Sequence, residues 1–89
     1  MADRITKSHI KTTFAHYCKA LGVPEAKAWN DVGGWFYDYN PTYGGYQIQR
    51  VHNASGGVDN PVKEARMPAG EFYRAMWFTI RSIEAHHRF

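Results

Sequence analysis

The densest group of aromatic residues in the chain surrounds a predicted turn. Six of the twelve residues in the segment 35–46 are aromatic, and aromatic residues favour strands. Pro41 and the Gly44-Gly45 pair supply the backbone conformations that a turn requires. The segment therefore predicts a β-hairpin with strands over 35–39 and 46–52. One face of a two-stranded ribbon cannot bury so many large rings, so we expect some of them at a surface that contacts another molecule.

Alternation along the two strands predicts which side chains face the core. A strand places successive side chains on opposite faces of the sheet. The predicted core face carries Trp35, Tyr37, Tyr39, Tyr46 and Ile48. The opposite, open face carries Phe36, Asp38, Gln47 and Gln49. Tyr43 lies at the tip, where no neighbouring segment is expected to cover it.

Helical periodicity is present on both sides of the hairpin. The segment 8–21 has one apolar stripe, formed by Ile10, Phe14, Tyr17, Cys18 and Leu21. Gly22 is placed to end this helix, and Pro24 follows it. A second stripe follows Pro68 and consists of Phe72, Met76, Thr79, Ile80 and Ile83. Both predicted helices can therefore pack an apolar face against the hairpin.

Two shorter elements complete the predicted order. Pro24 at a first helical position, with Glu25 after it, predicts a short helix near 24–30. The stretch 58–66 predicts a third strand, which Pro61 confines to an edge of the sheet. The length of 89 residues fits a single domain over 1–89. We expect an α+β fold in which a small antiparallel meander of two or three strands packs against two helices.

Cysteine content and hydropathy predict the compartment. The single cysteine, Cys18, excludes an internal disulfide. Polar residues follow Asp3-Arg4, which is not the pattern of a signal peptide. No apolar run approaches the roughly 20 residues of a membrane span. The sequence therefore predicts a cytoplasmic protein without a membrane anchor.

The last predicted helix has an aromatic pair outside its core stripe. Phe78 points away from the stripe, and Arg74 and Arg81 flank it at i−4 and i+3. An aromatic side chain between arginines is typical of the residues that dominate protein–protein binding. We therefore predict a protein-binding surface made of Tyr43, Arg74, Trp77, Phe78 and Arg81. Self-association would also cover Phe78, so the sequence leaves a homodimer open.

An alternative prediction is nucleic-acid binding. The net charge is +3, and the first 22 residues carry all of this excess. Basic side chains on the first helix would bind phosphate, and an exposed ring would stack on a base. The residues of this alternative are Lys7, Lys11, Lys19, Phe36 and Arg50.

No spacing typical of a catalytic or metal site occurs in the sequence. The histidines at 9, 16, 52, 86 and 87 form no His-Glu-x-x-His motif, and a lone cysteine cannot form Cys-x-x-Cys. The predicted hairpin could place Asp38 beside His52 as an acid–base pair, but the sequence offers no candidate nucleophile beside them. The glycine pairs lack the Lys-Ser/Thr of a phosphate-binding loop. We therefore predict a non-enzymatic protein without a metal ion or cofactor.

Two resemblances extend this interpretation. The helix–three-strand–helix order resembles the double-stranded-RNA-binding domain, but that family grips phosphate with lysines at the start of its last helix, and 68–73 contains none. The stretch 39–46, the Gly56-Gly57 turn and the segment 67–73 together resemble small uncharacterised accessory proteins of phages and mobile elements. This second resemblance covers about residues 33–83. It implies a protein that binds a larger protein of the host or phage, as an inhibitor or adaptor.

Overall fold

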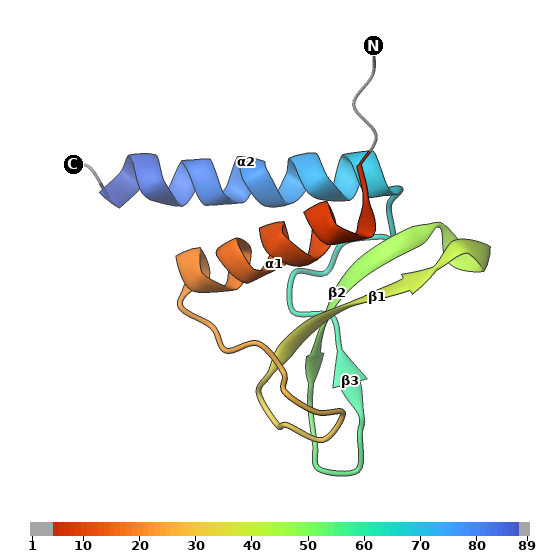
Figure 1. Ribbon diagram of the computed structural model, residues 1–89. Coiled ribbons are helices and arrows are strands. Elements are labelled where there is room, and N and C mark those ends of the chain that lie inside the picture. Colours follow the sequence, from red (N-terminus) through yellow and green to blue (C-terminus); the bar gives the residue numbers. More distant parts are fainter. Residues whose placement is uncertain (1–4, 88–89) are drawn as a thin grey trace.

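The computed structural model describes residues 5–87 and has two helices and a three-stranded antiparallel sheet (Figure 1). The elements follow in the order α1 (Lys7–Leu21), β1 (Trp35–Asn40), η1 (Pro41–Tyr43), β2 (Gly45–Val51), β3 (Val58–Asp59) and α2 (Ala69–His87). The predicted α+β class and the helix–strands–helix order are confirmed. Figure 1 shows α1 and α2 side by side, with the twisted sheet beneath α1.

Helix α1 has well-defined signals at both ends. The Thr6 side chain accepts a hydrogen bond from the His9 backbone N–H, and His9 Nδ1 accepts one from the Thr6 N–H at 3.1 Å. This reciprocal capping box satisfies two donors at the helix start. Gly22 ends the helix with φ 72°, the left-handed conformation that glycine adopts without steric cost. The predicted C-terminal boundary is confirmed.

The predicted hairpin forms. Strands β1 and β2 pair antiparallel, with Tyr37 opposite Ile48 and Tyr39 opposite Tyr46. A 3₁₀ turn over Pro41–Tyr43 connects them, and the Asn40 side chain accepts a hydrogen bond from the Thr42 N–H at 3.1 Å. The strand order in the sheet is β1-β2-β3.

The core lies between the two helices and one face of the sheet. The Tyr46 and Phe72 rings stack with centroids 5.2 Å apart, and the Phe14 ring meets Tyr37 edge-on at 5.2 Å. These ring pairs tie each helix to the hairpin. The buried cluster consists of Ile10, Phe14, Tyr17, Cys18, Tyr46, Ile48, Phe72, Met76 and Ile80.

The predicted helix near 24–30 is wrong. The chain bonds to β1 around Glu25 and turns over 27–30: the Trp35 N–H donates to the Pro24 carbonyl and the Ala26 N–H donates to the Trp35 carbonyl, each at 2.8 Å. These bonds form a parallel bridge between Glu25 and the first residue of β1. A helix of so few residues is unstable because helix nucleation is unfavourable. Hydrogen bonds to the edge of the sheet satisfy the backbone of this segment instead.

Two strand predictions also need correction. The third strand occupies only Val58–Asp59, because a turn at Asn60–Lys63 interrupts the predicted span 58–66. The chain returns to the sheet at Met67, which bridges Tyr46. Tyr39 was expected on the core face, yet it is 55% exposed. It lies near the end of the hairpin, where its ring covers Tyr46 at 4.7 Å and leaves its other side open.

Candidate functional site

The outer face of α2 carries a groove beside its most exposed large side chain. Phe78 is 75% exposed, whereas Phe72, Met76 and Ile80 on the opposite side of the helix are buried in the core. The groove has a volume of about 670 Å³. Its lining residues are Tyr73, Arg74, Trp77, Phe78, Arg81, Ser82 and Ala85. We call this the α2 groove.

Helical periodicity explains why these residues gather. Positions 74, 78 and 81 follow a 3–4 spacing, so they form one stripe along the helix surface. The core residues Phe72, Met76 and Ile80 follow their own i, i+4 spacing on another face. Four of the five predicted protein-binding residues therefore line one groove. The fifth, Tyr43, is 74% exposed in η1 at the hairpin tip and is not among the lining residues.

Trp77 forms the inner wall of the α2 groove and also contacts α1. Its ring lies 6.0 Å from the His16 ring, and the Arg81 guanidinium lies 5.9 Å from its centroid. The indole Nε1 is buried and has no hydrogen-bond partner among the described residues. Trp77 is half-buried and packs against the core cluster, so it supports the fold as well as the surface.

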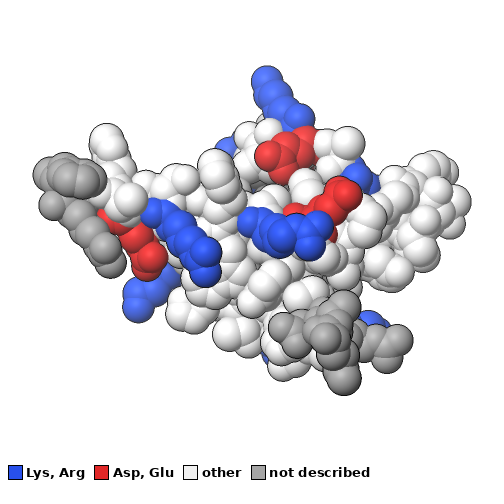
Figure 2. Space-filling model, turned by 90° about the horizontal axis from the view of Figure 1, so that it is seen from above, with Lys and Arg blue, Asp and Glu red and all other residues white. Residues whose placement is uncertain are grey.

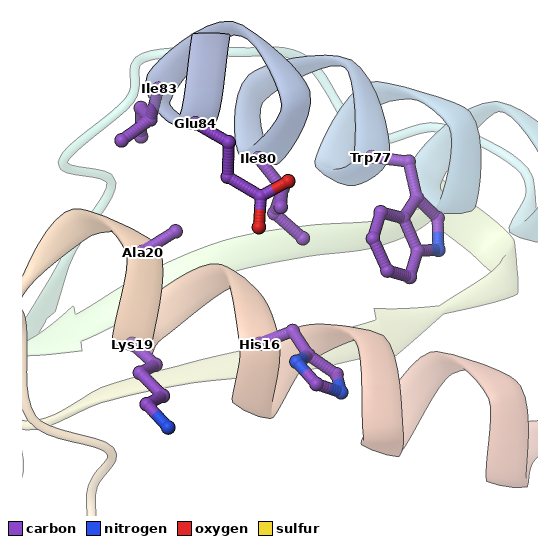
Figure 3. Close-up of a pocket in the computed structure, with 7 residues that line it drawn as sticks. All are labelled: His16, Lys19, Ala20, Trp77, Ile80, Ile83 and Glu84. Carbon is purple, nitrogen blue, oxygen red and sulfur yellow. The ribbon is translucent and has the colours of Figure 1, made fainter. Parts of the chain in front are cut away.

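A second pocket, of about 430 Å³, lies between the two helices and shares Trp77 with the α2 groove (Figure 3). Trp77 and Glu84 point from α2 toward α1, as Figure 3 shows. His16 and Lys19 contribute from α1. Because Trp77 lines both pockets, replacing it would alter both.

We expect Trp77→Ala and Trp77→Phe to differ in stability. The alanine variant should lose about 2 kcal/mol of unfolding free energy because a half-buried ring between two helices is removed. The phenylalanine variant should stay within about 1 kcal/mol of the parent because it keeps a ring and removes an unsatisfied N–H. Urea unfolding measures both. Equal losses in the two variants would contradict this account.

The arginines of the α2 groove differ electrostatically from the other arginines described. Arg66 donates to the Asp38 carboxylate at 2.7 Å, and Arg50 forms a bidentate pair with Asp59. That pair raises the pKa of Arg50 and lowers that of Asp59, chiefly through the side-chain hydrogen bonds. Within residues 5–87, Arg74 and Arg81 have no carboxylate within ion-pair distance. Their charges are therefore available at the surface.

The residues of the nucleic-acid alternative lie on different elements. Lys7, Lys11 and Lys19 are exposed on α1, and Arg50 is paired on β2. Phe36 is half-buried on β1, in a pocket with Trp29 and Val58. On the face that Figure 2 shows, acidic side chains lie beside the basic ones.

The pocket around Phe36 was missed by the sequence interpretation. It has a volume of about 430 Å³ and is lined by Ala26, Lys27, Ala28, Trp29, Phe36, Gly56 and Val58. Trp29 is 69% exposed, and its ring lies so close to Gly56 that a side chain there would collide with it. The predicted helix over 24–30 does not place Trp29 beside Phe36. The sequence does not show that Trp29 lies close to the Gly56-Gly57 turn.

The catalytic candidates are not brought together. Asp38 lies opposite Gln47 in the strand register and pairs with Arg66, so the considered pair with His52 does not form. Cys18 is buried in the core, and burial is the main cause that raises the pKa of its thiol to about 12. No group of three metal-ligating side chains occurs within the described part of the chain. Neither described helix is long and apolar enough to cross a membrane.

Comparisons with protein-family models, curated proteins and solved structures found no match to this chain. The functional argument therefore depends on the geometry of its own surfaces.

Proposed function

We propose that this chain is a small non-enzymatic binding module that docks onto another protein through the α2 groove. The observation that carries this proposal is Phe78, a large apolar ring that is 75% exposed between two arginines, neither of which has an ion-pair partner among residues 5–87. Burying such a ring against a partner contributes about 1.5–3 kcal/mol. Aromatic and arginine side chains at the centre of a pocket are the groups that usually dominate binding energy.

The proposed setting is the cytoplasm, where the module acts as an inhibitor or adaptor of a larger protein. Support comes from the resemblance of the segments 39–46, 56–57 and 67–73 to accessory proteins of phages and mobile elements. The described elements leave little room for a buried active site, because the core is filled by its own side chains. Binding through an exposed helix face requires no such site.

We expect Phe78→Ala to abolish binding and leave stability unchanged. Phe78 contributes little to the core, so its removal should change the unfolding free energy by less than about 0.5 kcal/mol. A photo-crosslinking amino acid at Ser82, which lines the α2 groove, should form a discrete protein adduct in an extract of the source cells. Excess unlabelled parent protein should compete for that adduct, and excess Phe78→Ala should not.

The control places the same crosslinker at Ala54, an exposed residue in the turn before β3. Ala54 should not yield the competed adduct. The proposal would be wrong if Ser82 gave no adduct, or if Phe78→Ala competed as well as the parent. An adduct of the chain with its own copy, accompanied by a dimer in light scattering, would assign the groove to self-association instead.

A further inference from the structure

Resting on the function proposed above, we infer that the α2 groove binds an acidic amphipathic helix of the partner protein. This helix would carry two carboxylates about two turns apart and an aliphatic side chain between them. The inference follows from the charge, spacing and surroundings of Arg74, Phe78 and Arg81.

The lining of the groove carries positive charge. Its described lining residues include two arginines and no carboxylate. Neither guanidinium has an ion-pair partner between residues 5 and 87, and Arg81 is positioned by its contact with the Trp77 ring. An arginine guanidinium presents donors in a planar fork that matches a carboxylate. The partner that complements this groove therefore brings carboxylates to both arginines.

The spacing of the two arginines sets the spacing of those carboxylates. Residues 74 and 81 are seven positions apart, which corresponds to about 10.5 Å along a helix axis. A partner helix repeats its own side chains with the same period, so acidic residues at i and i+7 face the two arginines. Phe78 lies between them, so an aliphatic side chain of the partner helix would pack against its ring. This arrangement is the helix-in-groove mode of recognition.

A second copy of this chain fits the same stripe poorly. An antiparallel pairing centred on Phe78 would place four guanidiniums, from Arg74 and Arg81 of both copies, at one interface. Within the described helix, Glu71 and Glu84 lie three residues outside Arg74 and Arg81. The pairing would leave Glu71 near Ala85 and Glu84 near Phe72 of the other copy, so neither carboxylate would lie opposite an arginine. Like charges at an interface are unfavourable, so the charge pattern favours an acidic partner.

Nucleic acid is also a weaker match. Binding to phosphates depends on several clustered cations, and the α2 groove offers two. A helix with two carboxylates matches the number of cations in the groove, whereas a duplex brings many more phosphates than two arginines can neutralise.

The test uses designed fluorescent helical peptides and the full chain. The acidic peptide has Glu at i and i+7 with Leu at i+4; a second peptide replaces both Glu by Lys, and a third replaces Leu by Ser. Anisotropy titrations are made at about 50 mM and about 300 mM salt, which changes the screening of exposed charges. The protein variants are R74E/R81E and, as a control with the same charge change, K7E/K11E on α1. Circular dichroism checks that both variants remain folded.

We expect the acidic peptide to bind the parent and K7E/K11E alike, and R74E/R81E at least about tenfold more weakly. The Lys peptide should bind R74E/R81E and not the parent, and the Ser peptide should bind the parent more weakly than the acidic one. Equal binding of the acidic peptide to both variants, or no binding of any peptide, would overturn the inference. Displacement of the peptide by a DNA duplex at equal charge concentration would overturn it in favour of nucleic acid.

The crosslinking experiment separates this inference from the proposed function. If R74E/R81E competes for the Ser82 adduct as well as the parent does, while Phe78→Ala does not, the groove binds a protein without using its arginines. The acidic-helix inference then fails and the proposed function stands. If no adduct forms at all, the proposed function itself fails.

Discussion

Gly45→Ala is expected to lose about 3–5 kcal/mol of unfolding free energy, enough to unfold much of a domain of this size. Gly45 has φ 117°, and a Cβ atom there would collide with the Met67 carbonyl oxygen. That oxygen accepts the Tyr46 N–H at 2.8 Å, so moving it away breaks the bridge that brings the chain back to the sheet before α2. Urea unfolding and the thermal midpoint measure the loss.

Gly44→Ala is the matched control. Gly44 also has a positive φ, of 107°, but a Cβ atom there would lie 3.6 Å from Arg66 Cβ and carbonyl O, which is ordinary contact. The two variants share the strain of a left-handed backbone, and only one has the collision. Gly44→Ala should therefore lose about 1–2 kcal/mol. Similar losses for the two variants would show that the close approach to Met67 does not matter.

Stability is expected to fall steeply at alkaline pH. Burial is the main cause that raises the pKa values of Tyr17 and Cys18 to about 12 in the folded state, from 10.0 and 9.0. Below about pH 8 both groups are protonated in both states and the unfolding free energy is unaffected. Between about pH 8 and pH 12 the unfolded chain loses these protons first and is favoured, so by pH 11 the loss should be about 4 kcal/mol.

Cys18→Ala tests the source of this pH dependence. The variant is destabilised at neutral pH by the lost thiol, and this loss does not itself vary with pH. The slope of unfolding free energy against pH near pH 10.5 should nevertheless be smaller than in the parent, because one of the two linked protons is gone. Urea unfolding at a series of pH values gives the slope. An unchanged slope would assign the alkaline transition to other groups.

The elements with strong local signals could be predicted from the sequence. The apolar stripe ending at Gly22 fixed the C-terminal end of α1, and the Pro41 and Gly44-Gly45 turn fixed the hairpin. The segment 24–30 could not be predicted in this way. Its conformation depends on two hydrogen bonds to Trp35, a partner that local propensity does not reveal.

The candidate site also has a part that the local sequence predicts and a part that depends on tertiary contacts. Phe78 between two arginines follows from helical periodicity alone, so the outer stripe of α2 was predictable. The extent to which Trp77 is buried could not be predicted, because it depends on where α1 crosses α2 and on the contact of Trp77 with His16. The exposure of Tyr39 depends on how far the hairpin extends past the helices. The pocket beside Trp29 requires the tertiary path of a loop.

The arrangement of the core has a consequence for synthesis on the ribosome. Ile10 on α1 and Ile80 on α2 belong to one buried cluster, although 70 residues separate them in the sequence. When the hairpin has left the exit tunnel, α1 and the sheet still lack the wall formed by Phe72, Met76 and Ile80. We therefore expect the nascent chain to expose its aromatic residues to chaperones and proteases until α2 emerges.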